Sequence, residues 1–196
     1  MKQDKKRYNI KGIIIAVLLI ALVLYYFNYL SNQSSKRKTE SEKAELEQLM
    51  EYNMSLDYPN TPRDVAKLHN RYFKLFYGQS LSDDELVVLN EKVRTLYSTE
   101  LLAINAEITN LNGLKQNIKD MNEQGYVYKS YTLPEASQVQ YFTRDGKEMA
   151  SLEVAMTIGT KDGIGYRDVK YILIKENDQW KIYGWGDVQT NTELNQ

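Results

Sequence analysis

The chain lacks cysteine altogether and holds a single histidine among its 196 residues. The absence of cysteine excludes disulfides, cysteine-ligated zinc, iron–sulfur clusters and thiol nucleophiles. A single histidine provides too few imidazole side chains for a histidine-rich metal site or a proton relay, and it makes a catalytic triad improbable. The sequence also lacks a Walker-type phosphate loop, a GxGxxG pattern, an HExxH pattern and an EF-hand loop. We therefore expect no metal and no cofactor.

An excess of either charge is missing as well. Lys and Arg number 25 against 26 Asp and Glu, which gives a formal net charge of -1. A dedicated nucleic-acid binder carries a clear basic excess, so we expect no nucleic-acid partner. Charged residues make up 26% and hydrophobic residues 42% of the chain, which excludes both a disordered chain and an all-membrane protein. The length allows one ordinary domain with attachments.

The N-terminal 30 residues consist of a basic segment followed by an apolar segment. Residues 1–12 hold five basic side chains and one acidic side chain, a balance of +4. The apolar run from Ile13 to Leu30 would form about 27 Å of helix, close to the ~30 Å hydrocarbon layer of a bilayer. Tyr25, Tyr26 and Phe27 lie near its end, where amphipathic rings prefer the headgroup boundary. The pattern predicts a cytoplasmic basic tail followed by an uncleaved transmembrane helix over residues 13–30.

A cleaved signal peptide is the alternative interpretation of this segment, because such peptides also combine a basic start with an apolar core. The run is longer than that core, and bulky aromatic residues follow it instead of a small-x-small cleavage pattern. Five cations precede the run and four follow it, so the positive-inside rule favours a cytoplasmic N-terminus by one charge. We expect a single-pass protein of the cell membrane, bound through Ile13 to Leu30, with its C-terminal domain extracytoplasmic.

Three regions are expected after the apolar run. Residues 31–57 are polar and predict a solvated linker with a short stalk helix from Ala44 to Met54. Residues 58–188 predict a folded domain in which helices come first and strands follow. Residues 189–196 are expected to form a flexible tail.

Helix start signals mark the first half of the domain. Thr61 followed by Pro62 predicts the cap and first position of one helix, and Ser82 with Glu85 three residues later predicts a capping box for the next. Thr99 begins a third helical segment, which a glycine and several asparagines are expected to kink or split. These signals predict three amphipathic segments.

The second half of the domain changes to a period of two. Residues 150–158 alternate between apolar and polar side chains, which is typical of a half-buried strand. Asp145 and Gly146 predict a type I′ hairpin before it. Further turn signals delimit about five antiparallel strands in all. The predicted fold class is therefore α+β, with helices packed on one face of a curved antiparallel sheet.

This layout resembles the nuclear transport factor two-like superfamily, the α+β cone that is also called cystatin-like. The resemblance rests on the Thr61–Pro62 helix start, the two further helices and the terminal strands YILIKENDQWKIYGWG, and it covers roughly Tyr58 to Val188. One departure is that the superfamily usually places a strand between the second and third helices, and the sequence shows none. The whole layout also resembles a family of single-span proteins of Firmicutes that carry a domain of unknown function.

The superfamily resemblance implies a pocket between sheet and helices, and some members are isomerases, dehydratases or epoxide hydrolases. Such enzymes need a base and a hydrogen-bond donor that face each other in an apolar cavity. The candidate bases are His69, Asp168 and Asp187. The pocket candidates are His69, Tyr72, Tyr97, Met156, Tyr171 and Trp185.

Each of these residues also has an ordinary explanation in packing or solvation, so two functions of different classes stay open. The first is a non-enzymatic binding or assembly module that contacts a protein partner or a second copy through an edge strand or the concave face of the sheet. The second is an isomerase or dehydratase that uses His69 or a carboxylate together with Tyr72. Because catalytic groups are scarce, we predict that the protein is not an enzyme and assign no catalytic residue.

Overall fold

The structure is a computed structural model that describes the backbone of residues 10–188 and the side chains of residues 19–31, 33 and 39–188. The expected tail at residues 189–196 and most of the basic tail lie outside the described residues. The chain divides into two compact units, residues 1–47 and 48–196. The described residues of the first unit, 10–47, are all helical, and the strands described all belong to the second unit.

A transmembrane helix was the prediction for residues 13–30, and it is wrong. Helix α1 runs without a break over Ile10–Glu51. No helix among the described residues has the length and apolarity needed to cross a membrane.

Two further expectations change with that finding. The predicted single-pass location at the cell membrane, with the membrane as a partner through Ile13 to Leu30, loses its basis. Residues 31–43, expected as a solvated linker, are helical and belong to α1. Leu49, near the end of α1 and within the second unit, is fully buried.

Four more helices follow in the second unit, and their starts confirm the capping signals. They are α2 (Pro62–Gly78), α3 (Asp83–Arg94), α4 (Thr99–Ile104) and α5 (Glu107–Gln124). The Thr61 side chain accepts a hydrogen bond from the Asp64 amide, and Ser82 with Glu85 forms a complete capping box. The third segment is split, as expected, into α4 and α5.

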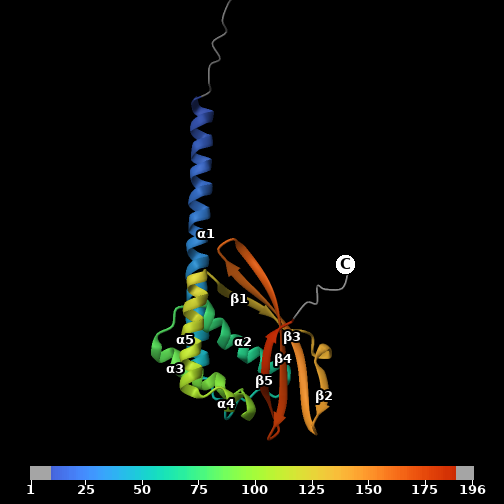
Figure 1. The fold of residues 1–196 in the computed structure, drawn as a ribbon. Helices are drawn as coiled ribbons and strands as arrows, with labels where there is room; N and C mark the ends of the chain where they lie inside the picture. The colour runs from blue at the N-terminus through green and yellow to red at the C-terminus, as the bar shows by residue number, and fades with distance from the viewer. Residues whose placement is uncertain (1–9, 189–196) are drawn as a thin grey trace, which may run out of the picture. The chain divides into compact units, whose positions relative to one another are not determined.

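Five antiparallel strands form one sheet, which confirms the α+β class. They are β1 (Val127–Thr132), β2 (Gln140–Arg144), β3 (Lys147–Thr160), β4 (Gly163–Glu176) and β5 (Gln179–Asp187), and a 3₁₀ turn, η1, covers Ala136–Gln138. The strand order is β1-β3-β4-β5, and β2 also pairs with β3. Figure 1 shows β3, β4 and β5 lying next to one another in this order.

Local turn chemistry sets the register of two of the three hairpins among residues 127–188. Asp145 and Gly146 both have positive φ between β2 and β3, and Asn177 and Asp178 both have positive φ between β4 and β5. Positive φ at both central residues is the mark of a type I′ turn. Bulges interrupt β1 against β3, and β5 against β4 next to Ile172, and such bulges increase bending and twist.

The core lies between the inner face of the sheet and α2. α2 contacts β1, β3 and β5 and buries nine residues, among them Val65 and Tyr72. The facing pair Leu152 and Tyr171 and the neighbouring Leu173 and Ile182 are buried on the same side of the sheet. At Gly78, where α2 ends, a Cβ atom would lie 2.9 Å from the carbonyl oxygen of Tyr128, so only glycine permits this close approach.

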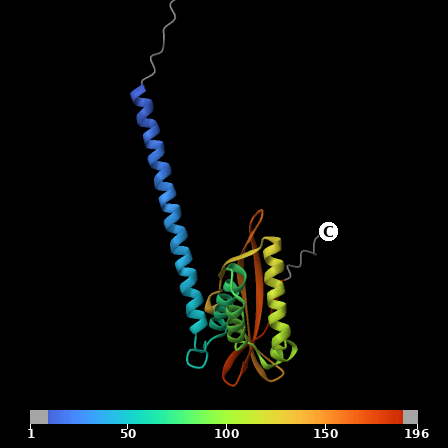
Figure 2. The same ribbon diagram turned by 90° about the vertical axis from the view of Figure 1, so that its left-hand side faces the viewer.

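Helix α5 packs differently from α2. None of its residues is buried, although Leu111, Leu114, Ile118 and Met121 are half-buried along one face. Its N-cap, Ala106, makes no side-chain capping bond, and Gly125 ends the helix in the left-handed region. In Figure 2 α5 is the yellow-green helix beside the strands. α5 is therefore attached to the core but is not part of it.

Truncation at the centre of the sheet tests this view of the core. Ile182→Ala removes a side chain with no exposed surface, and it is expected to lower the free energy of unfolding by about 2–5 kcal/mol. Ile164→Ala is the matched control because that side chain is 66% exposed, and its effect should stay within about 0.5 kcal/mol. Chemical denaturation followed by circular dichroism measures both. Equal effects of the two substitutions would contradict the assignment of Ile182 to the core.

Candidate functional site

The single histidine lies inside the core and not in an open pocket. His69 is fully buried on α2, with Nδ1 3.0 Å from the Tyr171 hydroxyl of β4 and Nε2 3.3 Å from the Tyr97 hydroxyl. The rings of Phe73 and Trp185 lie 4.1 Å and 4.8 Å from its ring, measured between centroids. Both ring nitrogens are therefore engaged within the protein.

The hydrogen bonds around His69 form one continuous network. Tyr128 of β1 donates to Oδ1 of Asn70 at 2.7 Å, and Nδ2 of Asn70 donates to the Tyr171 hydroxyl at 3.1 Å. Because the Tyr171 hydroxyl accepts from Asn70, its own proton is available to Nδ1 of His69. His69 then carries its proton on Nε2 and donates it to Tyr97. The network joins α2 to strands β1 and β4.

Burial sets the protonation state of His69. Desolvation lowers its pKa to about 3, because a buried imidazolium would lose its hydration without gaining a carboxylate partner. Burial also raises the pKa of Tyr97 and of Tyr171 above the usual value for a phenol. At neutral pH the network is uncharged. A neutral histidine with both nitrogens occupied has no free atom for a substrate.

The other predicted pocket residues separate into two groups. Tyr72 is not part of the hydrogen-bonded network around His69, since its hydroxyl donates to the carbonyl of Leu49 at 3.4 Å. Asp168 is exposed. In contrast, Met156 and Trp185 line the same cavity, and Tyr97 lines the cavity next to it. The structure thus brings Met156, Trp185 and Tyr97 to one region and leaves His69 and Tyr171 in the packed core behind it.

Two neighbouring cavities between α5 and the rest of the domain make up the candidate site, which we call the α5 cleft. The larger has a volume of about 450 Å³ and lies between α5 and the inner face of the sheet. The smaller, about 260 Å³, lies between α5, α2 and α3. Phe73, Tyr77, Asn117 and Trp185 line both cavities. The shared residues make the two cavities one site.

The walls of the α5 cleft combine aromatic and carboxamide side chains. Trp185, Phe73 and Tyr77 form an aromatic wall, and Phe73 contacts the rings of the other two. Asn110, Asn117 and Gln124 recur every seven residues along α5 and line the opposite wall. Residues seven apart share a helix face, so three side-chain amides point to one side. These amides lie along one margin of the apolar stripe of α5, and Asn117 hydrogen-bonds to Tyr77 on the opposite wall.

One ion pair lies at the margin of the larger cavity. Arg167 of β4 donates from Nε and from an η nitrogen to the two carboxylate oxygens of Asp187 on β5. The guanidinium of Arg167 holds the pKa of the Asp187 carboxyl below its usual value. Asp187 was a candidate base, but this pairing makes it a poor proton acceptor at neutral pH.

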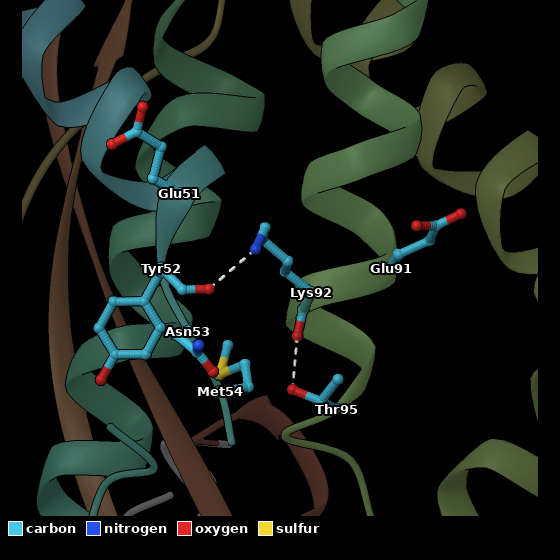
Figure 3. Close-up of a pocket in the computed structure, with 7 residues that line it drawn as sticks. All are labelled: Glu51, Tyr52, Asn53, Met54, Glu91, Lys92 and Thr95. Atoms are coloured by element: carbon cyan, nitrogen blue, oxygen red, sulfur yellow. Dashed lines mark hydrogen bonds between the residues drawn. The ribbon is translucent and has the colours of Figure 1, made fainter. Parts of the chain in front are cut away.

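A separate cavity lies where α1 ends against α3. It is lined by Glu51–Met54 together with Glu91, Lys92 and Thr95 (Figure 3). Its polar groups satisfy one another, because Lys92 donates to the carbonyl of Tyr52 at 2.8 Å and Thr95 donates to the carbonyl of Lys92 at 2.7 Å. Glu91 points away from these groups in Figure 3. This cavity has one aromatic and one carboxamide residue in its lining, Tyr52 and Asn53, whereas the α5 cleft has several of each.

Sequence reasoning missed the carboxamide wall and Arg167. The seven-residue recurrence of Asn110, Asn117 and Gln124 was the available signal, but we interpreted the asparagines there as helix-weakening residues. Arg167 carried no local signal, since its role depends on Asp187 being placed beside it by strand pairing.

The depressed pKa of His69 predicts a pH dependence of stability. The unfolded chain binds a proton below about pH 6.5 while the folded chain does not until about pH 3. Stability should therefore fall as pH decreases below 6.5, by up to about 1.4 kcal/mol per pH unit from this group. His69→Gln should lose that slope between pH 6.5 and 5. Parallel slopes in the two proteins, or an imidazole NMR signal that titrates near pH 6, would refute the assignment.

The Tyr171 hydroxyl is expected to be the most costly atom of the network to remove. Tyr171→Phe leaves both His69 and Asn70 without one buried partner, and it should lower the free energy of unfolding by about 1–3 kcal/mol. Tyr166→Phe is the matched control on the same strand, since Tyr166 is 81% exposed, and it should leave stability unchanged. Urea denaturation of both variants measures the difference.

Comparisons with known proteins place the chain by family. No curated protein matches it. Among solved structures, the transfer-protein candidate TraH of the Gram-positive conjugative plasmid pIP501 is 14% identical, with a TM-score of 0.39 over 69% of this chain and 100% of TraH. The intermembrane space region of the chloroplast protein ARC6 is 15% identical, with a TM-score of 0.30 over 66% of this chain and 98% of that region. Both scores are too low to support an argument.

A match to a protein family covers more of the chain than either solved structure does. The family described as "Domain of unknown function (DUF6715)" matches residues 1–185, which include α1, the network around His69 and most of the α5 cleft. The chain therefore belongs to the DUF6715 family.

Proposed function

We propose that this protein is a non-enzymatic binding module that receives its ligand in the α5 cleft. The observation that carries the proposal is the combined cleft of about 450 Å³ and 260 Å³ lined by aromatic and carboxamide side chains. Ligand sites in proteins have volumes of this order and the same combination of apolar walls with a few polar groups. The resemblance to the nuclear transport factor two-like cone stays a prediction, and the proposal does not depend on it.

The arrangement of titratable groups favours binding over catalysis. Acid–base catalysis requires a group that can exchange a proton with the substrate. His69 has both nitrogens occupied, and Asp187 is held by Arg167. Tyr72, the proposed donor, is bonded to the backbone of α1. The alternative of an isomerase or dehydratase therefore has no base and donor facing each other among the described residues.

Blocking the cleft tests the proposal. Anilinonaphthalene sulfonate, a fluorescent probe with apolar rings, is expected to bind the full-length protein at one site. Ile158→Trp places a large side chain in the cavity that Ile158 lines, and it should weaken binding of the probe about tenfold. The probe is excited outside the tryptophan band, so the added indole does not disturb the measurement.

The control is Ile164→Trp, which adds the same side chain at an exposed position of β4 outside the cleft. It should leave binding of the probe as in the unsubstituted protein, and both variants should keep the native circular dichroism spectrum. Absence of probe binding to the unsubstituted protein, or equal binding by the two variants, would contradict the proposal.

A further inference from the structure

The free edge of β5 lies next to the α5 cleft. Val188 donates its N–H to the carbonyl of Asp168 at 2.9 Å, so this pair is hydrogen-bonded across β4 and β5. In an antiparallel ladder, hydrogen-bonded and non-bonded pairs alternate. Gly186 therefore directs its backbone groups toward β4, whereas Trp185 and Asp187 direct theirs away from the sheet. Among residues 10–188, no backbone partner meets those outward groups of Trp185 and Asp187.

The same edge already pairs with another segment earlier along β5. Ile182 donates to the carbonyl of Leu96 at 2.7 Å and accepts from the amide of Ser98 at 2.9 Å, which makes a parallel bridge. This pairing stops where α4 begins at Thr99, because the Ser98 carbonyl accepts from the Leu102 amide of α4 at 2.9 Å instead of from β5. The edge of β5 thus accepts an extended backbone at Ile182 and is left open at Trp185 and Asp187.

The cleft beside the open edge is suited to the side chains and peptide groups of such a segment. The Trp185 side chain lines both cavities while its backbone faces outward, so the edge and the cleft meet at one residue. The amides of Asn110 and Gln124 each carry donors and an acceptor, as a peptide group does, and the amide of Asn117 hydrogen-bonds to Tyr77. At Gly184 and Gly186 a Cβ atom would meet nothing within 4 Å, so the face of β5 opposite the Trp185 side chain is uncovered there.

We infer that the α5 cleft takes an extended peptide segment of a partner protein, which adds to the edge of β5 at Trp185 and Asp187 and places apolar side chains against the aromatic wall. The inference rests on the proposed function and specifies its ligand. Alternating backbone donors and acceptors match only another extended backbone, which distinguishes a peptide from a lipid or a small molecule. The occupant is therefore a strand-forming peptide with apolar side chains at alternate positions.

The test begins with a phage-displayed library of random heptapeptides selected on the full-length protein. The expected result is a set of peptides with alternating apolar residues that compete with anilinonaphthalene sulfonate. Methylation of single backbone nitrogens of one selected peptide should weaken its binding at alternate positions, because alternate N–H groups point to β5. This measurement uses the unsubstituted protein, so it does not depend on a variant that folds.

A pair of substitutions tests the protein side of the pairing. Asp187→Pro and Asp187→Ala both remove the carboxylate, but only the proline removes the outward N–H. Proline is tolerated on an edge strand where its nitrogen faces outward. Asp187→Pro should bind the selected peptide about tenfold more weakly than Asp187→Ala.

Three results would overturn the inference: recovery of no peptide, binding insensitive to every methylation, or equal affinity of the two variants. If the protein then still binds anilinonaphthalene sulfonate in a manner blocked by Ile158→Trp, the cleft is a site for small molecules and the proposed function stands without the peptide. If the probe does not bind either, both proposals fail together.

Discussion

The hydrogen-bonded network around His69 is the constraint on which the rest of the domain depends. It places an imidazole, an amide and three phenols in a space that water does not reach, and it connects α2 to β1 and β4. Buried polar groups cost free energy unless each has a partner, so only one rotation and one height of α2 on the sheet satisfy all of them. The apolar contacts of the core supply most of the free energy of folding, and the hydrogen-bonded network fixes the position of α2 on the sheet.

The position of the network also determines where the cleft can form. His69 and Tyr171 fill the centre of the sheet–helix layer, and Trp185 lies against the His69 ring. The aromatic wall of the cleft is therefore the outer surface of the same cluster. α5 faces this wall with amides as well as apolar side chains, and the two cavities lie between them. A rigid wall on one side and a helix without buried side chains on the other suit a binding site better than an active site.

Local signals in the sequence were sufficient for the helix starts and the hairpins. Thr61, Ser82 and the Asp145–Gly146 pair act through contacts within a few residues, so their effect can be recognised without knowing the fold. The continuation of α1 beyond Leu30 was missed, because the polar composition of residues 31–43 does not show that a helix passes through them. The superfamily resemblance implied a pocket between sheet and helices and named Trp185 among its residues. The parts of the cleft formed by Arg167 and Asn117 could not be predicted, because these residues meet Trp185 only after β5 pairs with β4 and α5 lies beside them.

The lack of buried side chains in α5 has a consequence for how a ligand gains access. Segments with few buried contacts open at a lower free energy than the strands of the core, and they do so without global unfolding. The N-terminus of α5 has no side-chain cap, whereas its C-terminus is held by the hydrogen-bonded Gly125 cap, so opening is expected to begin at the N-terminal end. Local opening of α5 would therefore let a ligand enter and leave the α5 cleft while the rest of the domain stays folded.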